Sequence, residues 1–352
     1  MSHTAGMDTS GLPVPDAIHP LLEQLHEALL LEVKYQPNLH QLPTTTQNDE
    51  ITIGARDGSA HVLRCLKVWY DLSSDVFFMA INLMDRFLSK MKAKPKHMAC
   101  ISVSAFHIAA VQMAQSLDAD HLVSISQCKC TGGDLKRMSE LIQNKLEWAP
   151  GTQPITALSF LRLFNDMFHT VASQLGLGDI YTSIVTEFEL LLRLEMVVCD
   201  GNCASLRPSE VALVLLCTYL DAAVKRLDAN ADTTATPIDG SSSHNTSATQ
   251  EQIVPLVQFA AELKKICKIS DESFFSTYEA VGAILSKYNA QEQTPHRQRL
   301  IWRLSSRTAR ILRPTDKLTS VLPAIAEHAP VPSPSRIRKS RKFTRRHGNK
   351  RR

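Results

Sequence analysis

An aspartate and an arginine stand side by side at Asp85 and Arg86, in the middle of a strongly apolar stretch that spans residues 76–91. Apolar residues surround most of a helical wheel here, which is the pattern of a buried helix. A carboxylate in such a place needs a cation from a neighbouring helix, because removing one member of a buried ion pair costs about 3–5 kcal/mol. The adjacent Arg86 points elsewhere, so the candidate partners are Arg56 and Arg64 in the preceding helical pattern.

The remaining reactive side chains do not form a set that could catalyse a reaction. His107 lies in the most apolar helical pattern, where hydrogen bonding to the backbone is the expected role of a histidine. Serine, histidine and carboxylate residues do not occur in a context that supports a catalytic triad, a carboxylate pair or a phosphate-binding loop. We therefore predict a protein that is not an enzyme and needs no cofactor.

Eight cysteines are scattered along the chain, several of them inside apolar helical patterns. The pairs Cys128/Cys130 and Cys199/Cys203 lack a second pair of ligands at zinc-finger spacing, so we expect no bound metal, with a structural zinc ion as the alternative. The sequence shows no secretory signal, which favours reduced thiols in an intracellular protein.

Helices must position these residues, because the apolar pattern is helical and no strand alternation occurs. After residues 1–15, which we expect to be disordered, a helix begins near Asp16, a candidate N-cap. Two sets of five helical patterns follow, with breaks expected at Pro95 and at Gly132-Gly133. They cover residues 56–71, 74–91, 97–115, 118–126 and 134–148, then 156–175, 179–196, 208–227, 252–268 and 271–288. The third is the most apolar, so we expect the others to surround it.

These patterns divide the chain into parts of different character. The stretch 228–250 has almost nothing to bury and is predicted to be a disordered insert. The longest apolar run, residues 211–220, is about half the length of a membrane span, so we predict a core helix and no membrane partner. The predicted parts are a disordered N-terminus at 1–15, a helix and linker at 16–50, a first helical domain at 51–150, a second at 151–290 and a basic tail at 291–352.

Charge is divided unevenly between the body of the chain and its tail. Residues 291–352 hold 17 Lys and Arg against 3 Asp and Glu, whereas residues 1–290 hold 22 against 32. The last 17 residues contain ten Lys and Arg and no acid, so they cannot form a core and should stay extended.

Basic clusters of this kind are used as nuclear-import signals, and a tail that serves only solubility is the alternative. The import signal that we predict contains Arg336, Arg338, Lys339, Arg341, Lys342, Arg345 and Arg346. Direct nucleic-acid binding by the last 17 residues is not expected, because Phe343 is the one residue among them suited to base stacking. We expect an import receptor as a partner, and a protein found in nucleus and cytoplasm.

The segment "MDRFLSKMKAKPKHMACISVSAFHIAA" at residues 84–110, followed by "DLKRMSELIQNKLEW" at 134–148, resembles the cyclin box. Residues 301–328, "IWRLSSRTARILRPTDKLTSVLPAIAEH", resemble the C-terminal segment of the G-type cyclins. The resemblance implies two tandem five-helix bundles. In the family, an arginine that opens the first box helix pairs with the aspartate of "DRFLS", which implies that Arg56 is the partner of Asp85.

The resemblance also implies where a kinase would bind and which groups are missing there. Cyclins that activate kinases hold the kinase's regulatory helix with a lysine near the end of the third helix and a glutamate early in the fifth. Val111 and Ser139 occupy these positions and offer neither the donors of an ammonium group nor the acceptors of a carboxylate. We expect weak or absent activation of a bound cyclin-dependent kinase. Glu140 could replace the glutamate only if the helix rotated or the alignment were shifted by one residue.

The patch through which many cyclins recruit substrates corresponds to residues 55–62. Gly58, Ser59 and Val62 stand there in place of bulky residues, and shallow side chains make a poor docking pocket.

The tail contains a pattern that suggests a second partner. Leu322, Ile325 and Glu327 have the spacing Leu-x-x-Ile-x-Glu, which resembles the docking motif for B-prime regulatory subunits of protein phosphatase 2A. The G-type cyclins are associated with that phosphatase. Because such short motifs also occur by chance, a tail segment that packs against its own bundle is the alternative.

Thr294 and Ser333 each precede a proline, with Arg297 and Arg336 two residues after that proline. This pattern is favoured by proline-directed kinases, so both hydroxyls are phosphorylation candidates.

Two hypotheses follow from the sequence. The first is a cyclin G-type adaptor in cell-cycle control that binds a cyclin-dependent kinase, a phosphatase subunit, or both. The alternative is a cyclin-like helical module associated with transcription or nucleic acid. Such a module needs a basic face on its folded body, whereas the body of this chain is acidic.

Overall fold

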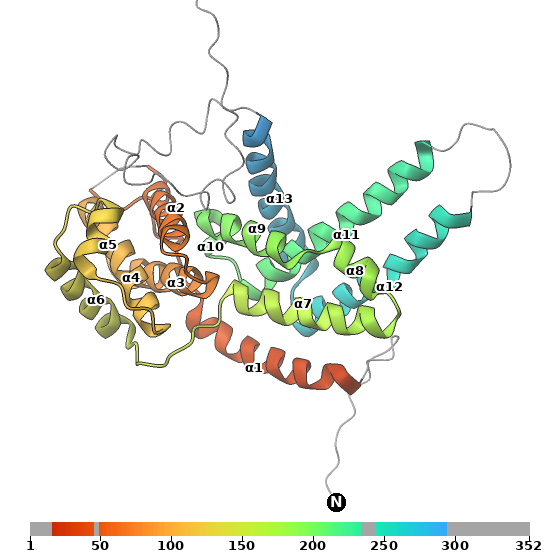
Figure 1. Ribbon diagram of the computed structural model, residues 1–352, viewed down its shortest axis with the longest axis horizontal. Coiled ribbons are helices and arrows are strands. Elements are labelled where there is room, and N and C mark those ends of the chain that lie inside the picture. Colours follow the sequence, from red (N-terminus) through yellow and green to blue (C-terminus); the bar gives the residue numbers. More distant parts are fainter. Residues whose placement is uncertain (1–15, 46–48, 234–243, 294–352) are drawn as a thin grey trace, which may run out of the picture. The chain divides into compact units, whose positions relative to one another are not determined.

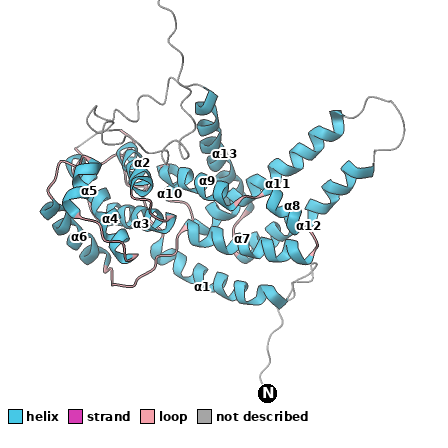
Figure 2. Cartoon of the chain, viewed as in Figure 1, coloured by secondary structure: helices cyan, strands magenta, loops and turns pink. Residues whose placement is uncertain are grey.

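The computed structural model describes residues 16–45, 49–233 and 244–293, and Figure 1 shows how their helices are arranged. Every regular element in these ranges is a helix (Figure 2), which confirms the predicted all-α fold. None of these helices is both long enough and apolar enough to cross a membrane. Helix α13 (Asp271–Gln293) includes the first three residues of the predicted basic tail, and the rest of that tail, residues 294–352, lies outside the described residues.

The N-terminal helix and the first set of five form as the apolar patterns predict. A 3-10 turn at Asp16–Ile18 leads into α1 (His19–Tyr35). The first set consists of α2 (Ile53–Trp69), α3 (Ser74–Lys90), α4 (Met98–Gln112), α5 (Ala119–Ser126) and α6 (Gly132–Leu146), with a 3-10 turn at Pro95–His97 before α4. Helix α4 is buried on nearly all sides and packs against α2, α3, α5 and α6, so the most apolar pattern is the central helix.

The second set is built around α11. It consists of α7 (Ala157–Gln174), α8 (Gly178–Ile184), α9 (Glu187–Cys199), α10 (Gly201–Ala204), α11 (Pro208–Thr233), α12 (His244–Ile266) and α13 (Asp271–Gln293). Helix α11 packs against α7, α12 and α13, and its residues 211–216 are fully buried. The run that is too short for a membrane span is therefore a core helix.

Helix α1 lies along α7 (Figure 1) and is fixed to the second set by one buried acid. Glu32 is 2% exposed and accepts a hydrogen bond from the Ser209 backbone N–H at 2.7 Å, at the start of α11. Its other oxygen accepts from Arg207 Nη2 at 2.9 Å. A carboxylate at a helix N-terminus is favourable, because the first N–H groups of the helix lack partners within it.

Two predicted helix starts are wrong. Asp16 lies in the 3-10 turn and Ile18 is the N-cap of α1, with a proline at the first helical positions instead of a side-chain cap. Gly132 was expected to break a helix but begins α6, because Thr131 forms a capping box with Asp134. The glycine is needed there, since its N–H donates to Asp120 Oδ1 at 3.1 Å and a Cβ would collide with that carboxylate.

Two predicted segments in the second set also differ from the structure. The single helix expected over residues 179–196 is divided into α8 and α9, because β-branched residues follow one another at 184–186 and lose side-chain freedom in a helix. The insert predicted at 228–250 is helical at both ends, since α11 extends through Thr233 and α12 begins at His244. Extending a helix that has already formed costs less than starting one. Residues 234–243 lie outside the described ranges.

Candidate functional site

Arg56 in α2 is fully buried and forms the pair that the apolar stretch around Asp85 requires. Its Nε donates a hydrogen bond to Asp85 Oδ1 at 2.8 Å and its Nη2 donates one to Asp85 Oδ2 at 2.6 Å. This is a bidentate ion pair with α3. The guanidinium also donates to the backbone oxygens of Val198 and Cys199 at 2.9 Å, at the end of α9. Burial alone would lower the pKa of Arg56. The negative charge of Asp85 and the hydrogen bonds to it outweigh burial, so the pKa of Arg56 lies above its usual value. One side chain thus joins α2, α3 and α9.

The second candidate partner of Asp85, Arg64, pairs with a different acid. Glu195 in α9 is 1% exposed and accepts from Arg64 Nε at 3.2 Å and from Ser74 Oγ at 2.8 Å. Lys67 also donates to Glu195. Glu195 and its partners were not predicted from the sequence. The signal was nevertheless the same as at Asp85, namely one acid within an apolar run, here that of α9.

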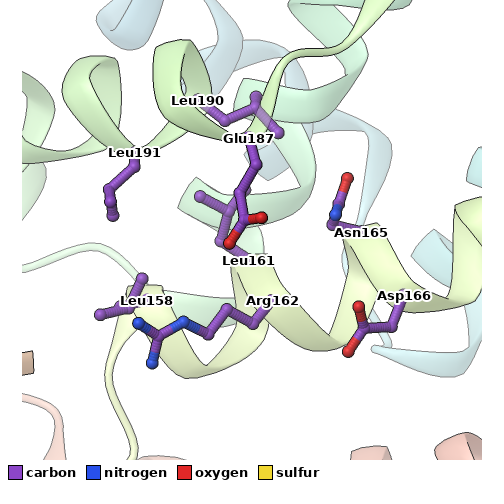
Figure 3. Close-up of a pocket in the computed structure, with 8 residues that line it drawn as sticks. All are labelled: Leu158, Leu161, Arg162, Asn165, Asp166, Glu187, Leu190 and Leu191. Carbon is purple, nitrogen blue, oxygen red and sulfur yellow. The ribbon is translucent and has the colours of Figure 1, made fainter. Parts of the chain in front are cut away.

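A surface ion pair adds a further link between the two helix sets. Arg162 in α7 meets Asp75 at the start of α3 through two hydrogen bonds of 2.5 and 2.9 Å. Arg162 also lines a groove between α7 and α9, where Glu187 faces Arg162 and Asp166 across a floor of leucines (Figure 3). The groove has a volume of about 210 Å³, which is below the range of about 300–1,000 Å³ in which small molecules are usually bound.

The two kinase-facing positions implied by the family lie on adjacent helices. Val111, near the end of α4, is 54% exposed, so an apolar side chain faces outward at the position where the resemblance implies a lysine in kinase-activating cyclins. Ser139 in α6 is buried, and its hydroxyl has no hydrogen-bond partner among the described residues. Glu140 is exposed one residue further along. Helices α4 and α6, which carry these two positions, pack on each other.

The surface that corresponds to the substrate-recruiting patch is shallow. Gly58 is exposed, and a Cβ at that position would have no neighbour within 4 Å. The Ser59 hydroxyl is turned back to the Ala55 carbonyl oxygen at 3.0 Å, and Val62 packs against the core. These residues offer no exposed bulky apolar anchor.

His107 is half-buried in α4, and none of the cysteines forms a disulfide. Burial lowers the pKa of His107, which hydrogen-bonds to the backbone of Leu117. All eight cysteines are free thiols, and the described residues contain no group of three or more His, Cys, Asp or Glu side chains arranged to hold a metal ion.

The predicted sites in the tail all lie outside the described residues. They are the phosphorylation candidates Thr294 and Ser333, the docking residues Leu322, Ile325 and Glu327, and the import residues Arg336, Arg338, Lys339, Arg341, Lys342, Arg345 and Arg346.

An all-α chain with two helix sets joined by a buried Arg–Asp pair is consistent with a cyclin-type protein, and comparison with known proteins shows that class. Residues 24–149 match the family "Cyclin, N-terminal domain". Cyclin G of Drosophila melanogaster is 40% identical over 94% of this chain, which spans 56% of that protein's length. Human Cyclin-G2 is 31% identical over 87% of this chain and 81% of its own length, and human Cyclin-G1 is 28% identical over 88% and 96%.

The chain belongs to the cyclin G family. Proteins of the cyclin family are regulatory rather than catalytic, and membership supports a cyclin-type regulatory role in the cell cycle.

Proposed function

We propose that this protein is a regulatory adaptor that binds a cyclin-dependent kinase with weak or absent activation and binds a B-prime subunit of protein phosphatase 2A through its tail. The observation that carries the kinase half is the pair of neutral side chains, Val111 and Ser139, in the region of α4 and α6. Hydrogen bonds to charged groups contribute about 1.5–3 kcal/mol each, so two absent charged groups weaken the hold on a kinase helix substantially.

The phosphatase half rests on the spacing of Leu322, Ile325 and Glu327. In an extended peptide, residues three apart are about 10 Å apart, so the two aliphatic side chains reach separate pockets while the carboxylate meets a basic group. Burial of each aliphatic side chain contributes about 1.5–3 kcal/mol, and the charged contact a similar amount. Ordering the peptide opposes binding, which leaves an expected affinity in the micromolar range, about −8 kcal/mol.

Calorimetry with a purified B-prime subunit and a peptide of residues 319–331 tests the proposed binding to the phosphatase subunit. The wild-type peptide should bind with micromolar affinity, and changing both Leu322 and Ile325 to Ala should abolish binding. Lys317 precedes this peptide, so a longer peptide of residues 315–331 with Lys317→Ala is the matched control and should bind like the wild type. Equal binding by the double variant, or no binding by the wild type at high micromolar concentration, rejects the motif.

The same proposal includes a nuclear pool of the protein. The basic cluster that runs from Arg336 to Arg346 would engage an import receptor, and phosphorylation of Ser333 would place a dianion beside it and offset part of its charge. We therefore propose that the protein divides between nucleus and cytoplasm.

A further inference from the structure

Three cysteine thiols meet where the loop between α5 and α6 lies against α4. Cys128 and Cys130 stand in the loop, and their sulfur atoms are 3.0 Å apart. Cys100, in the first turn of α4, hydrogen-bonds to both. The other five cysteines, at positions 65, 199, 203, 217 and 267, have no such sulfur contact among the described residues.

The loop thiols are within reach of solvent. Cys128 and Cys130 are half-buried and flank the exposed Lys129, whereas Cys100 lies beneath them and is 8% exposed. The two sulfurs stand about 1 Å further apart than the roughly 2.05 Å of a disulfide, so a bond between them needs little movement of the loop.

We propose that Cys100, Cys128 and Cys130 form a peroxide-reactive site that ends in a disulfide between Cys128 and Cys130. The hydrogen bond with Cys128 has the largest effect on the pKa of Cys100 and lowers it to about 6, so we assign the Cys100 thiolate as the nucleophile at neutral pH. The hydrogen bond to Cys100, together with burial, raises the pKa of Cys128, which stays a thiol.

The reaction has three balanced steps. The Cys100 thiolate attacks one oxygen of hydrogen peroxide and breaks the O–O bond, which gives a sulfenic acid and a hydroxide that takes a proton to become water. The Cys128 thiol then attacks the sulfenic sulfur and forms an S–S bond, while its proton leaves with the sulfenic hydroxyl group as a second water. Finally Cys130 attacks the Cys128 sulfur and expels the Cys100 thiolate, whose low pKa makes it a good leaving group. Overall, two thiols are oxidised and one peroxide is reduced to two waters.

Peptide mapping of the full chain after treatment with one equivalent of hydrogen peroxide tests this assignment. Trypsin cleaves after Lys129, which lies between the two loop cysteines, so the fragments carrying Cys128 and Cys130 should remain joined until a reductant is added. Separate fragments with unmodified cysteines, or peroxide taken up equally by all eight cysteines, would overturn the proposal.

Three variants separate the roles of the sulfurs. Cys130→Ser should trap a disulfide between Cys100 and Cys128, Cys128→Ser should form none of these disulfides, and Cys100→Ser should slow the reaction at least tenfold. Cys65→Ser is the control and should oxidise like the wild type, because burial raises the pKa of Cys65 to about 11 and keeps it a thiol. An undiminished rate in Cys100→Ser would show that Cys100 is not the nucleophile.

Discussion

At the scale of single residues, buried charges join parts of the chain that are far apart in sequence. The apolar surroundings of Asp85 were sufficient to predict a buried cation partner, but they left Arg56 and Arg64 as alternatives. The structure shows why residue spacing alone could not decide which of the two arginines pairs with Asp85. Which arginine pairs with Asp85 depends on α9, more than 120 residues further along the chain. The carbonyl groups at the end of α9 accept hydrogen bonds from Arg56, and Glu195 of α9 accepts one from Arg64.

The Arg56–Asp85 pair should matter for stability much more than a pair at the surface. Asp85→Ala should lower the free energy of unfolding by about 3–5 kcal/mol, because it leaves a fully buried guanidinium without its carboxylate. Asp75→Ala is the matched control, since it removes an exposed partner of Arg162 and should cost about 1 kcal/mol or less. Chemical denaturation measures both, and equal costs for the two variants would contradict the assigned role of the buried pair.

Asp57, beside Arg56, should give stability a specific dependence on pH. Burial raises the pKa of its carboxyl group to about 6, so between about pH 4 and pH 6 the folded protein binds more protons there than the unfolded chain does. The contribution of this group to stability therefore increases as the pH falls through 6 and decreases as it rises.

Asp57→Asn removes that titration. The variant should therefore have a higher free energy of unfolding than wild type at pH 7.5 and lose that advantage at pH 5. Urea unfolding at both values measures the difference, and Glu189→Gln, an exposed position on α9, is the control. A gap between wild type and Asp57→Asn that is the same at both pH values would show that Asp57 titrates normally in the folded protein.

At the scale of elements, helix type followed from the apolar pattern more reliably than helix ends did. The predominantly apolar sequence of α4 correctly predicted the central helix, because only a helix surrounded by others can bury nearly all of its faces. The start of α6 could not be predicted from Gly132, because the capping box and the approach of Asp120 decide it. The exposure of Val111 and the burial of Ser139 likewise depend on how α4 and α6 pack.

Glu195 in α9 should be the strongest single link between α9 and the helices α2 and α3. Glu195→Ala should reduce the free energy of unfolding by about 3–5 kcal/mol, because it leaves Arg64 and Lys67 largely buried and without a carboxylate. Glu189→Ala changes an exposed acid of the same helix and should have little effect. Thermal and urea unfolding of the two variants make the comparison, and a Glu195 variant as stable as the Glu189 variant would rule out this link.

At the scale of the whole molecule, the chain combines a folded acidic body with a strongly basic terminal segment. The two helix sets are those of the cyclin G family, while the proposed phosphatase and import-receptor partners depend on residues known from the sequence alone. Spacing can indicate a docking peptide or an import signal because such segments act as short linear motifs. It cannot predict which surface of a folded bundle a kinase would meet, because that surface is assembled from separate helices.

The basic segment should direct nuclear entry. Deleting residues 336–352 should shift a fluorescent fusion of the chain toward the cytoplasm, because the deletion removes ten positive charges and no negative ones. Deleting residues 1–15, which carry no Lys or Arg, is the control and should leave the distribution unchanged. Fluorescence imaging reads both, and an unaltered nuclear signal after loss of the tail would rule out this import signal.

The most direct test of the central claim is a reconstituted kinase assay with purified cyclin-dependent kinases and a saturating amount of this chain, beside a kinase-activating cyclin. We expect phosphorylation rates near those of the kinases alone, because Val111 and Ser139 lack the charges of the lysine and glutamate that hold the kinase's regulatory helix in kinase-activating cyclins. The variant Val111→Lys, at the exposed one of the two positions, should bind a kinase about tenfold more tightly, and Glu140→Gln should leave binding unchanged. Strong activation of a kinase by the unmodified chain would contradict the account.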